Sequence, residues 1–131
     1  MKATAVMEIG KDGFFSCYME DEFPDFGIIG SGETAQEAKE DFICAYEEIK
    51  EMLQEEGKEV PELEFEWRYD MKSFFNYFNF LNISKVAERA GINPSLMRKY
   101  VAGLANPSEN QYKKLNNAVK DFSRELISAE F

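Results

Sequence analysis

Residues 83–103 read ISKVAERAGINPSLMRKYVAG, and this stretch decides how the second half of the chain folds. Ala87 lies four residues before Gly91. A small residue at that distance lets two helices cross closely, and a glycine permits the sharp corner between them. The stretch therefore predicts two short helices, one on each side of Gly91. Apolar residues are available to hold these helices together: Val86, Ala90, Ile92, Met97 and Tyr100.

Capping residues mark the ends of both helices. Asn82 precedes a helix over Ile83–Ala90, and Asn93 precedes the next helix, which has Pro94 at its first position. Asparagine is favoured immediately before a first turn, and proline lacks only an N–H that would be unpaired there. Gly103 predicts the end of the second helix. This is the helix-turn-helix arrangement, in which the second helix enters the major groove of DNA. A plain helical bundle is the alternative.

The predicted second helix exposes side chains suited to base edges. Arginine and lysine bind guanine, and an apolar side chain such as Leu96 can contact the methyl group of thymine. We expect Leu96 and Ala102 to be exposed where polar residues are more usual. Few phosphates would then be contacted per chain, so binding is expected to need a dimer. The candidate base-reading residues are Asn93, Ser95, Leu96, Arg98 and Lys99.

The chain continues with GLANPS over residues 103–108. Together with the preceding stretch, this pattern resembles DNA-binding domains of the Cro/repressor type. The resemblance implies that the loop before the next helix touches phosphate, with Asn106 and the N-terminus of the last helix at the matching positions. The candidate phosphate-binding residues are Lys85, Asn106, Lys113 and Lys114.

The two halves of the chain carry opposite charge. Residues 1–70 hold 6 Lys/Arg against 20 Asp/Glu, a net charge of −14, whereas residues 71–131 hold 9 against 5, a net charge of +4. Such an asymmetry suggests two domains with different partners. We therefore place a domain boundary between residues 70 and 71. The basic half is suited to nucleic acid, and the acidic half either meets a basic partner or serves solubility.

The pattern of apolar and polar residues in the first half predicts a sheet with one helix. Thr34 and Glu37 form a capping box that begins the helix, and Gly57 is placed to end it. Its apolar stripe is Ala38, Phe42, Ala45, Tyr46, Ile49, Met52 and Leu53. The strands are predicted over Lys2–Ile9, Phe14–Met19, Phe26–Gly32 and Leu63–Tyr69. The order β-β-β-α-β predicts a mostly antiparallel sheet, with the last strand parallel to its neighbour because the helix returns the chain.

The rest of the second half is predicted to be helical, which makes the fold class α+β with an all-α C-terminal domain. A short helix is expected over Met71–Phe80, and a long one follows Pro107 and Ser108. Its stripe runs through Tyr112, Leu115, Val119, Phe122 and Leu126 to Ile127 and Phe131. We expect this stripe to belong to the core and part of it to form a dimer seam.

Composition excludes several classes of protein. The chain has no histidine, which removes the commonest general base and the commonest zinc ligand. Cys17 and Cys44 are too few for a disulfide framework, and both are expected to be buried free thiols of a cytoplasmic protein. No apolar run approaches a membrane span. Only Glu8 lies near the end of the first strand, so a two-metal nuclease is not expected. We predict no catalytic residue, no metal and no cofactor.

The first half also resembles a known family. FPDF at residues 23–26 is followed by GETAQEAKEDFICAYEEI at 32–49 and then by a glycine and a proline before the last strand. This order of motifs resembles the HicB antitoxins, whose N-terminal domain is joined to a DNA-binding domain. The matching residues are Pro24, Asp25, Gly32, Glu33, Thr34, Glu37, Ala38, Gly57 and Pro61.

The HicB resemblance implies a partial ribonuclease-H-like fold without nuclease activity. It also implies an antitoxin that binds a small, basic, mRNA-cleaving HicA-like toxin and represses its own promoter. The candidate toxin-binding residues are Glu20, Asp21, Glu22 and Asp25, for which a solvated loop is the alternative. Two other functions stay open: a stand-alone dimeric regulator whose first domain senses a ligand or dimerises, and an interaction protein that has lost DNA binding.

Overall fold

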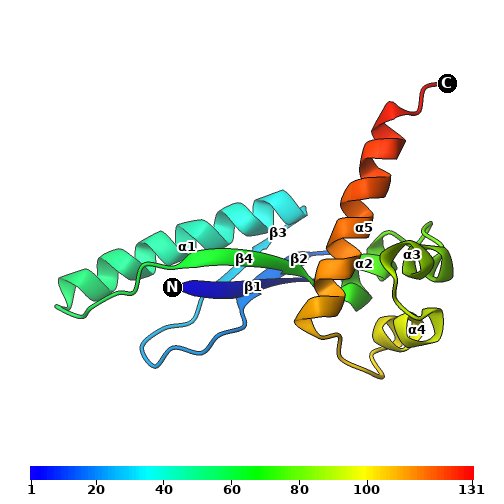
Figure 1. Cartoon of the computed structure of the whole chain (residues 1–131). Coiled ribbons are helices and arrows are strands. Elements are labelled where there is room, and N and C mark those ends of the chain that lie inside the picture. The colour runs from blue at the N-terminus through cyan, green and yellow to red at the C-terminus, as the bar shows by residue number, and fades with distance from the viewer. The chain divides into compact units, whose positions relative to one another are not determined.

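The computed structural model describes residues 1–131, which form two compact units, Met1–Asp70 and Met71–Phe131 (Figure 1). The units divide where the charge of the chain changes sign. The fold class is α+β, as predicted. The first unit holds a sheet and one helix, and the second is helical throughout. The elements in chain order are β1 (Lys2–Ile9), β2 (Phe15–Met19), β3 (Ile29–Gly32), α1 (Ala35–Glu55), β4 (Glu64–Tyr69), α2 (Met71–Tyr77), α3 (Ile83–Ala90), α4 (Pro94–Ala102) and α5 (Glu109–Ser128).

The sheet of the first unit is mixed, with the strand order β3-β2-β1-β4. β1 pairs antiparallel with β2 and parallel with β4, so that Ala5 stands between Met19 and Trp67. β3 adds an antiparallel edge beside β2. The predicted element order and the parallel last strand are both confirmed. A helix between β3 and β4 carries the chain back across the sheet, and this crossover permits the parallel pairing.

The core of the first unit lies between α1 and one face of the sheet, along which α1 runs in Figure 1. Side chains alternate across a strand, so every second residue of β1 points at the helix. Tyr46 closes one end of this core: its hydroxyl donates to the carbonyl of Pro61 (3.0 Å) and accepts from the N–H of Leu63 (2.9 Å). The buried residues are Ala3, Ala5, Met7, Phe15, Cys17, Ile28, Ala38, Phe42, Tyr46 and Leu63.

Gly30 in β3 is where the sheet and α1 come closest. A Cβ atom placed on Gly30 would lie 2.3 Å from the backbone nitrogen of Phe42 and 2.6 Å from the carbonyl oxygen of Ala38. Only glycine fits such an approach without moving the helix. One turn of α1 also binds the strand edge, because the Asp41 carboxylate accepts from the N–H of Ser31 (2.9 Å).

The ends of α1 follow the sequence closely. The Thr34 hydroxyl accepts from the N–H of Glu37 (3.1 Å), as the capping box predicts. The Glu37 carboxylate reaches back to the N–H of Glu33 (2.9 Å), one residue earlier than the usual reciprocal contact. At the other end, the N–H of Lys58 reaches the carbonyl of Leu53 (2.9 Å) around Gly57.

Several predicted boundaries and faces are wrong. β3 begins at Ile29 and not at Phe26, because Phe23 and Phe26 pair across the Pro24 turn with ring centroids 5.1 Å apart. α2 ends at Tyr77 and not at Phe80, whose side chain is exposed. Met52 is 48% exposed and Cys44 is also exposed. Each residue turns a helix by 100°, so Cys44 stands about 200° from Phe42, on the solvent side of α1.

The two cysteines are predicted to react very differently. Cys17 is fully buried, and burial raises its pKa to about 11 against a smaller opposing effect of the Lys39 cation. Because the thiolate is the nucleophile, iodoacetamide at pH 8 should modify Cys44 and leave Cys17 intact in the native chain. Folding favours the neutral Cys17 thiol, so this contribution to stability is complete below pH 9 and is lost as the pH rises toward 11. Mass spectrometry of alkylated peptides measures the difference, and equal labelling of both cysteines would contradict it.

The second unit has its own core, formed where α2, α3, α4 and α5 meet. The buried residues are Met71, Phe75, Val86, Ala87, Ile92, Met97, Tyr100 and Leu115. The predicted core role of the end of α5 is wrong: Leu126 is 63% exposed and Ile127 84% exposed, and Phe131 is exposed as well. The core reaches along this helix as far as Phe122. α5 is longer than its neighbours, so its apolar stripe continues beyond Phe122 into solvent.

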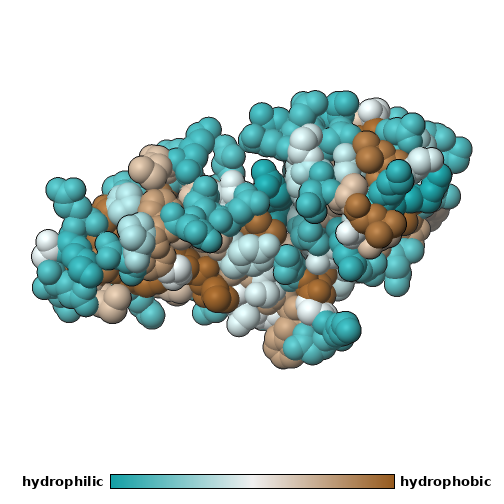
Figure 2. Space-filling view, turned by 90° about the horizontal axis from the view of Figure 1, so that it is seen from below, coloured by the Kyte–Doolittle hydropathy of each residue, from teal (hydrophilic) through white to brown (hydrophobic).

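Hydrophilic side chains predominate on the face of the molecule that Figure 2 shows, where apolar groups form separate patches. None of the helices combines the length and the apolar character that crossing a bilayer requires.

Candidate nucleic-acid interface

α3 and α4 are joined by a tight turn that the sequence specifies locally. The Asn82 side chain accepts from the N–H of Lys85 (3.1 Å) and begins α3. Gly91 has a φ of 71° and ends it, a backbone conformation that L-residues with side chains disfavour. The Asn93 side chain then accepts from the N–H groups of Ser95 (2.9 Å) and Leu96 (3.2 Å). These contacts confirm the predicted caps and set the direction of α4.

Packing fixes which side of α4 faces outward. Met97 and Tyr100 are buried, and the Tyr100 hydroxyl accepts from the Gln111 side chain (3.3 Å) on α5. The side away from this contact is polar and positively charged. Its exposed residues are Ser95, Arg98, Lys99 and Ala102.

Two candidate base-reading residues differ from expectation in their surroundings. Leu96 is only partly exposed, because it stands one turn before Tyr100 and packs against the core of the second unit. Leu96 is therefore less exposed than predicted. Asn93 is exposed, but its side-chain oxygen is occupied by the cap of α4. Ser95, Arg98 and Lys99 stand together on the exposed side of α4 within its first two turns.

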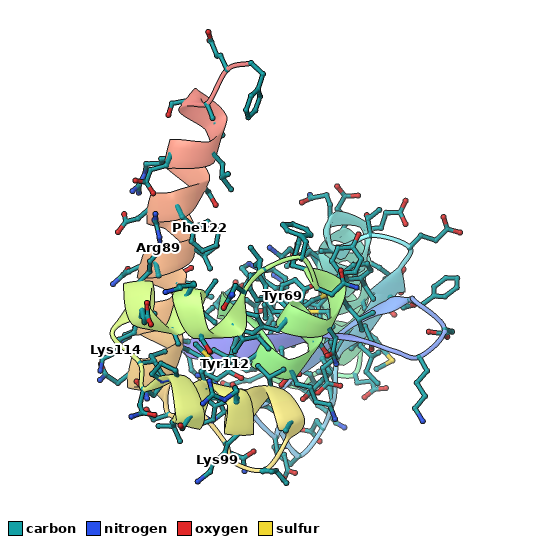
Figure 3. The ribbon with its side chains drawn as sticks, turned by 90° about the vertical axis from the view of Figure 1, so that its right-hand side faces the viewer. Tyr69, Arg89, Lys99, Tyr112, Lys114 and Phe122 are labelled. Atoms are coloured by element: carbon teal, nitrogen blue, oxygen red, sulfur yellow. The ribbon has the colours of Figure 1, made fainter.

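The cations of the second unit fall into two groups. Three have a carboxylate partner: Lys85 with Glu88, Arg89 with Glu125, and Arg124 with Asp121. The remaining six have no carboxylate within 4.0 Å: Lys72, Arg98, Lys99, Lys113, Lys114 and Lys120. Figure 3 shows Lys99 pointing outward from α4 and Lys114 pointing outward from the first half of α5. The positive charge of these side chains is therefore available to an anionic partner.

The candidate phosphate-binding residues are not equivalent. Lys113 and Lys114 are exposed and unpaired on α5, and Asn106 is exposed in the loop before it. Lys85 is held at 3.5 Å from the Glu88 carboxylate, which reduces its attraction for phosphate. In Figure 3, Lys114 leaves the helices on a different side from Lys99.

Lys72 is a further candidate that the sequence did not single out. A Cβ placed on Gly103 would lie 3.6 Å from its Nζ atom, so this amine lies beside the turn that ends α4. The packing of α2 against α4 brings it there. In the sequence, Lys72 is marked only by its position just after residue 70, where the net charge changes sign. Its approach to Gly103 could not be predicted, because no local pattern reveals which helices pack together.

The acidic candidates Glu20, Asp21, Glu22 and Asp25 are all exposed, but most of them bind within the chain. Asp21 accepts from the N–H of Thr4 (2.7 Å), Glu20 pairs with Arg68 (3.2 Å), and Asp25 pairs with Lys58 (3.6 Å). The Asp21 side chain thus continues the hydrogen bonding of β1 beyond Met19, the last residue of β2. This contact gives Asp21 a structural role. Of the four, only Glu22 has no hydrogen-bond or ion-pair partner within the chain.

Carboxylates do not converge in this fold. No group of three or more His, Cys, Asp or Glu side chains is arranged to hold a metal ion. Glu8 accepts a hydrogen bond from the Tyr18 hydroxyl (3.0 Å). Burial, this hydrogen bond and the charges of Glu8, Asp70 and Glu20 raise the pKa of Tyr18 to about 12, so Tyr18 stays a neutral donor to Glu8.

Comparison of the chain with protein-family models, with curated proteins and with solved structures found no match.

Proposed function

We propose that the protein is a DNA-binding antitoxin that represses transcription through a helix-turn-helix formed by α3 and α4. The observation that carries the DNA-binding part is the exposed side of α4, where Arg98 and Lys99 have no carboxylate partner. Phosphate groups dominate the affinity of proteins for DNA, so unpaired cations on an exposed helix favour this ligand. In the proposed complex, the first turns of α4 contact base edges in the major groove.

The surrounding residues supply the phosphate contacts. Lys72 lies beside the end of α4, Asn106 lies in the loop that follows, and Lys113 and Lys114 are exposed on α5. Contacts of this kind fix the position of a protein on the duplex without reading its sequence. The proposed interface therefore combines a reading helix with flanking anchors on α2 and α5.

The double variant Arg98→Ala plus Lys99→Ala tests the DNA-binding part. The probe is a duplex selected by the wild-type chain from a synthetic library with a randomised centre. We expect the double variant to weaken binding about 100-fold, since it removes one base contact and one charged anchor. Fluorescence anisotropy at several salt concentrations gives the affinity and the number of released counterions.

A matched control removes the same charge elsewhere. Lys120→Ala plus Arg124→Ala lies on the second half of α5, outside the proposed interface, and should change the affinity less than about threefold because only general attraction is lost. Equal losses in the two double variants would show that net charge, and not α4, governs binding. Failure of the wild-type chain to select any duplex would leave the interaction protein without DNA binding as the remaining candidate.

The antitoxin part rests on the HicB-like order of motifs and on the net charge of −14 in residues 1–70. We interpret the β-β-β-α-β unit as the partial ribonuclease-H-like domain of that family, which would bind a small basic HicA-like toxin in the cytoplasm. The loop carboxylates are largely engaged within the chain. The outer side of α1, by contrast, carries exposed Glu48, Glu51 and Glu55 without ion-pair partners, so we place the toxin contact there.

Native mass spectrometry of the tagged chain recovered from its own host cells tests the antitoxin part. We expect a stoichiometric small basic protein that is retained by the Arg98→Ala plus Lys99→Ala variant. Replacement of Glu48, Glu51 and Glu55 by lysine should release this partner, because attraction between opposite charges holds such complexes together. A bare chain would favour the stand-alone regulator, and loss of the partner in the DNA-binding variant would contradict two separate binding surfaces.

We further propose that the protein binds DNA as a homodimer, because two-fold operators are read by two-fold proteins. The uncovered apolar end of α5, with Leu126 at 63% and Ile127 at 84% exposure, supports an additional contact. Light scattering of the full chain gives its mass in solution, and a monomer at the concentrations that saturate DNA would contradict the dimer.

A further inference from the structure

Arg98 is joined to two serine hydroxyls on two different helices. Its Nη1 atom donates to Oγ of Ser84 on α3 (2.8 Å), and its Nη2 atom donates to Oγ of Ser95 on α4 (3.1 Å). Ser95 stands one turn before Arg98 on the same helix, whereas Ser84 is brought there by the turn at Gly91. The guanidinium therefore bridges the first turns of both helices.

The charge of Arg98 is left uncompensated at this position. The two other arginines of the second unit are paired with Glu125 and Asp121, but both partners of Arg98 are neutral. Ser84 and Ser95 each occupy the second position after a capping asparagine. The N-terminal end of a helix carries a partial positive charge, which disfavours a cation. The arrangement thus places a cation where the isolated protein gains little from it, and it suits an acceptor-rich ligand.

The donor count indicates which ligand fits. A guanidinium has five N–H donors in a fixed plane, and the two serines engage two of them. Three donors remain for a ligand. Guanine presents two acceptors, N7 and O6, in the major groove, and arginine binds both at once. A guanidinium that is already held by two hydroxyls loses less side-chain freedom when it binds.

We infer that Ser84 is a positioning residue that holds Arg98 for bidentate hydrogen bonding to a guanine in the DNA site. This inference rests on the proposed DNA binding by α4. Ser84 itself touches no base, and it acts through the orientation of the Arg98 guanidinium. Asn82, and not Ser84, caps α3, so replacement of the Ser84 hydroxyl leaves the helix start intact.

The test uses the full chain and the duplex selected from the randomised library, with each guanine replaced in turn by 7-deazaguanine, which lacks the N7 acceptor. At one guanine the replacement should weaken wild-type binding about tenfold. Ser84→Ala should weaken binding to the intact duplex about fivefold, yet less than about twofold to the duplex modified at that guanine, because the contact it supports is already lost. Ser84→Thr keeps the hydroxyl and should restore most of the affinity.

Control measurements separate this inference from its premise. Ser123→Ala, on α5 and outside the interface, should leave both affinities unchanged, and circular dichroism should show equal thermal midpoints for all variants. Equal losses on the intact and modified duplexes would overturn the positioning role while leaving DNA binding by α4 in place. If no guanine responds and Arg98→Ala only lowers the salt slope by about one, Arg98 binds phosphate and the inference is wrong. A wild-type chain that selects no duplex refutes the proposed DNA binding itself.

Discussion

Replacement of Gly30 by alanine is expected to lower the free energy of unfolding of the first unit by about 3 kcal/mol. The added Cβ would lie 2.3 Å from the backbone nitrogen and 2.7 Å from the Cα of Phe42. These are backbone atoms of α1, so no side-chain rotation relieves the clash. The helix must move away from β3, and its buried contacts with the sheet loosen together.

Urea unfolding followed by tryptophan fluorescence measures this effect, because Trp67, the single tryptophan, lies in β4. Gly27→Ala is the matched control. A Cβ at Gly27 meets no atom within 4 Å, and its φ is not in the left-handed region, so its effect on the free energy should stay within about 1 kcal/mol. A Gly30→Ala chain with the same midpoint as the control would show that α1 does not lie so close to β3.

Phe42→Ala is expected to cost about 4 kcal/mol of stability. Phe42 has no exposed surface and makes edge-to-face contacts with Phe65 (centroids 4.9 Å apart) and Trp67 (5.5 Å). Truncation removes both aromatic contacts and leaves a cavity between helix and sheet, which a small unit has little means to refill. A loss of this size is a large part of the stability of a typical domain, so much of the first unit would unfold near physiological temperature.

Two further variants make the Phe42 prediction specific. Phe42→Leu keeps most of the volume and should cost about 1.5 kcal/mol. Ile43→Ala changes the neighbouring residue, which is 38% exposed on the outer part of α1, and should cost less than about 1 kcal/mol. The same fluorescence transition reports all three. Equal shifts for Phe42→Ala and Ile43→Ala would contradict the assigned orientation of the helix.

Local chemistry made much of this fold predictable. Asn82, Asn93 and Thr34 are caps whose partners lie two or three residues away, so the sequence alone identifies them. The alternation of Leu63, Phe65, Trp67 and Tyr69 with charged residues likewise indicated which side of β4 faces the helix. Both signals depend only on neighbours in the chain.

Most of the errors concern features that are decided by residues far apart in the chain. Leu126 belongs to an apolar stripe, but its exposure depends on how far the neighbouring helices reach along α5. Cys44 is an exception, because its angle of about 200° from Phe42 on α1 already indicates the solvent side. Leu96 was expected in solvent because the depth of α4 in the core cannot be read from its own sequence. The contact of Arg98 with Ser84 and the approach of Lys72 to Gly103 both need the packed helices, and for this reason the sequence did not reveal these two parts of the candidate site.

The parallel pairing of β1 with β4 has a consequence for the synthesis of the protein on the ribosome. Lys2 pairs with Glu64 and Met7 with Tyr69, so the first strand made must wait for the last strand of its sheet. Until then one edge of β1 is open to strands of other chains. The contacts of α3 with α4 span far fewer residues and form faster once synthesised. A nascent chain therefore presents an unpaired edge of β1 to its surroundings until Glu64–Tyr69 has left the ribosome and paired with it.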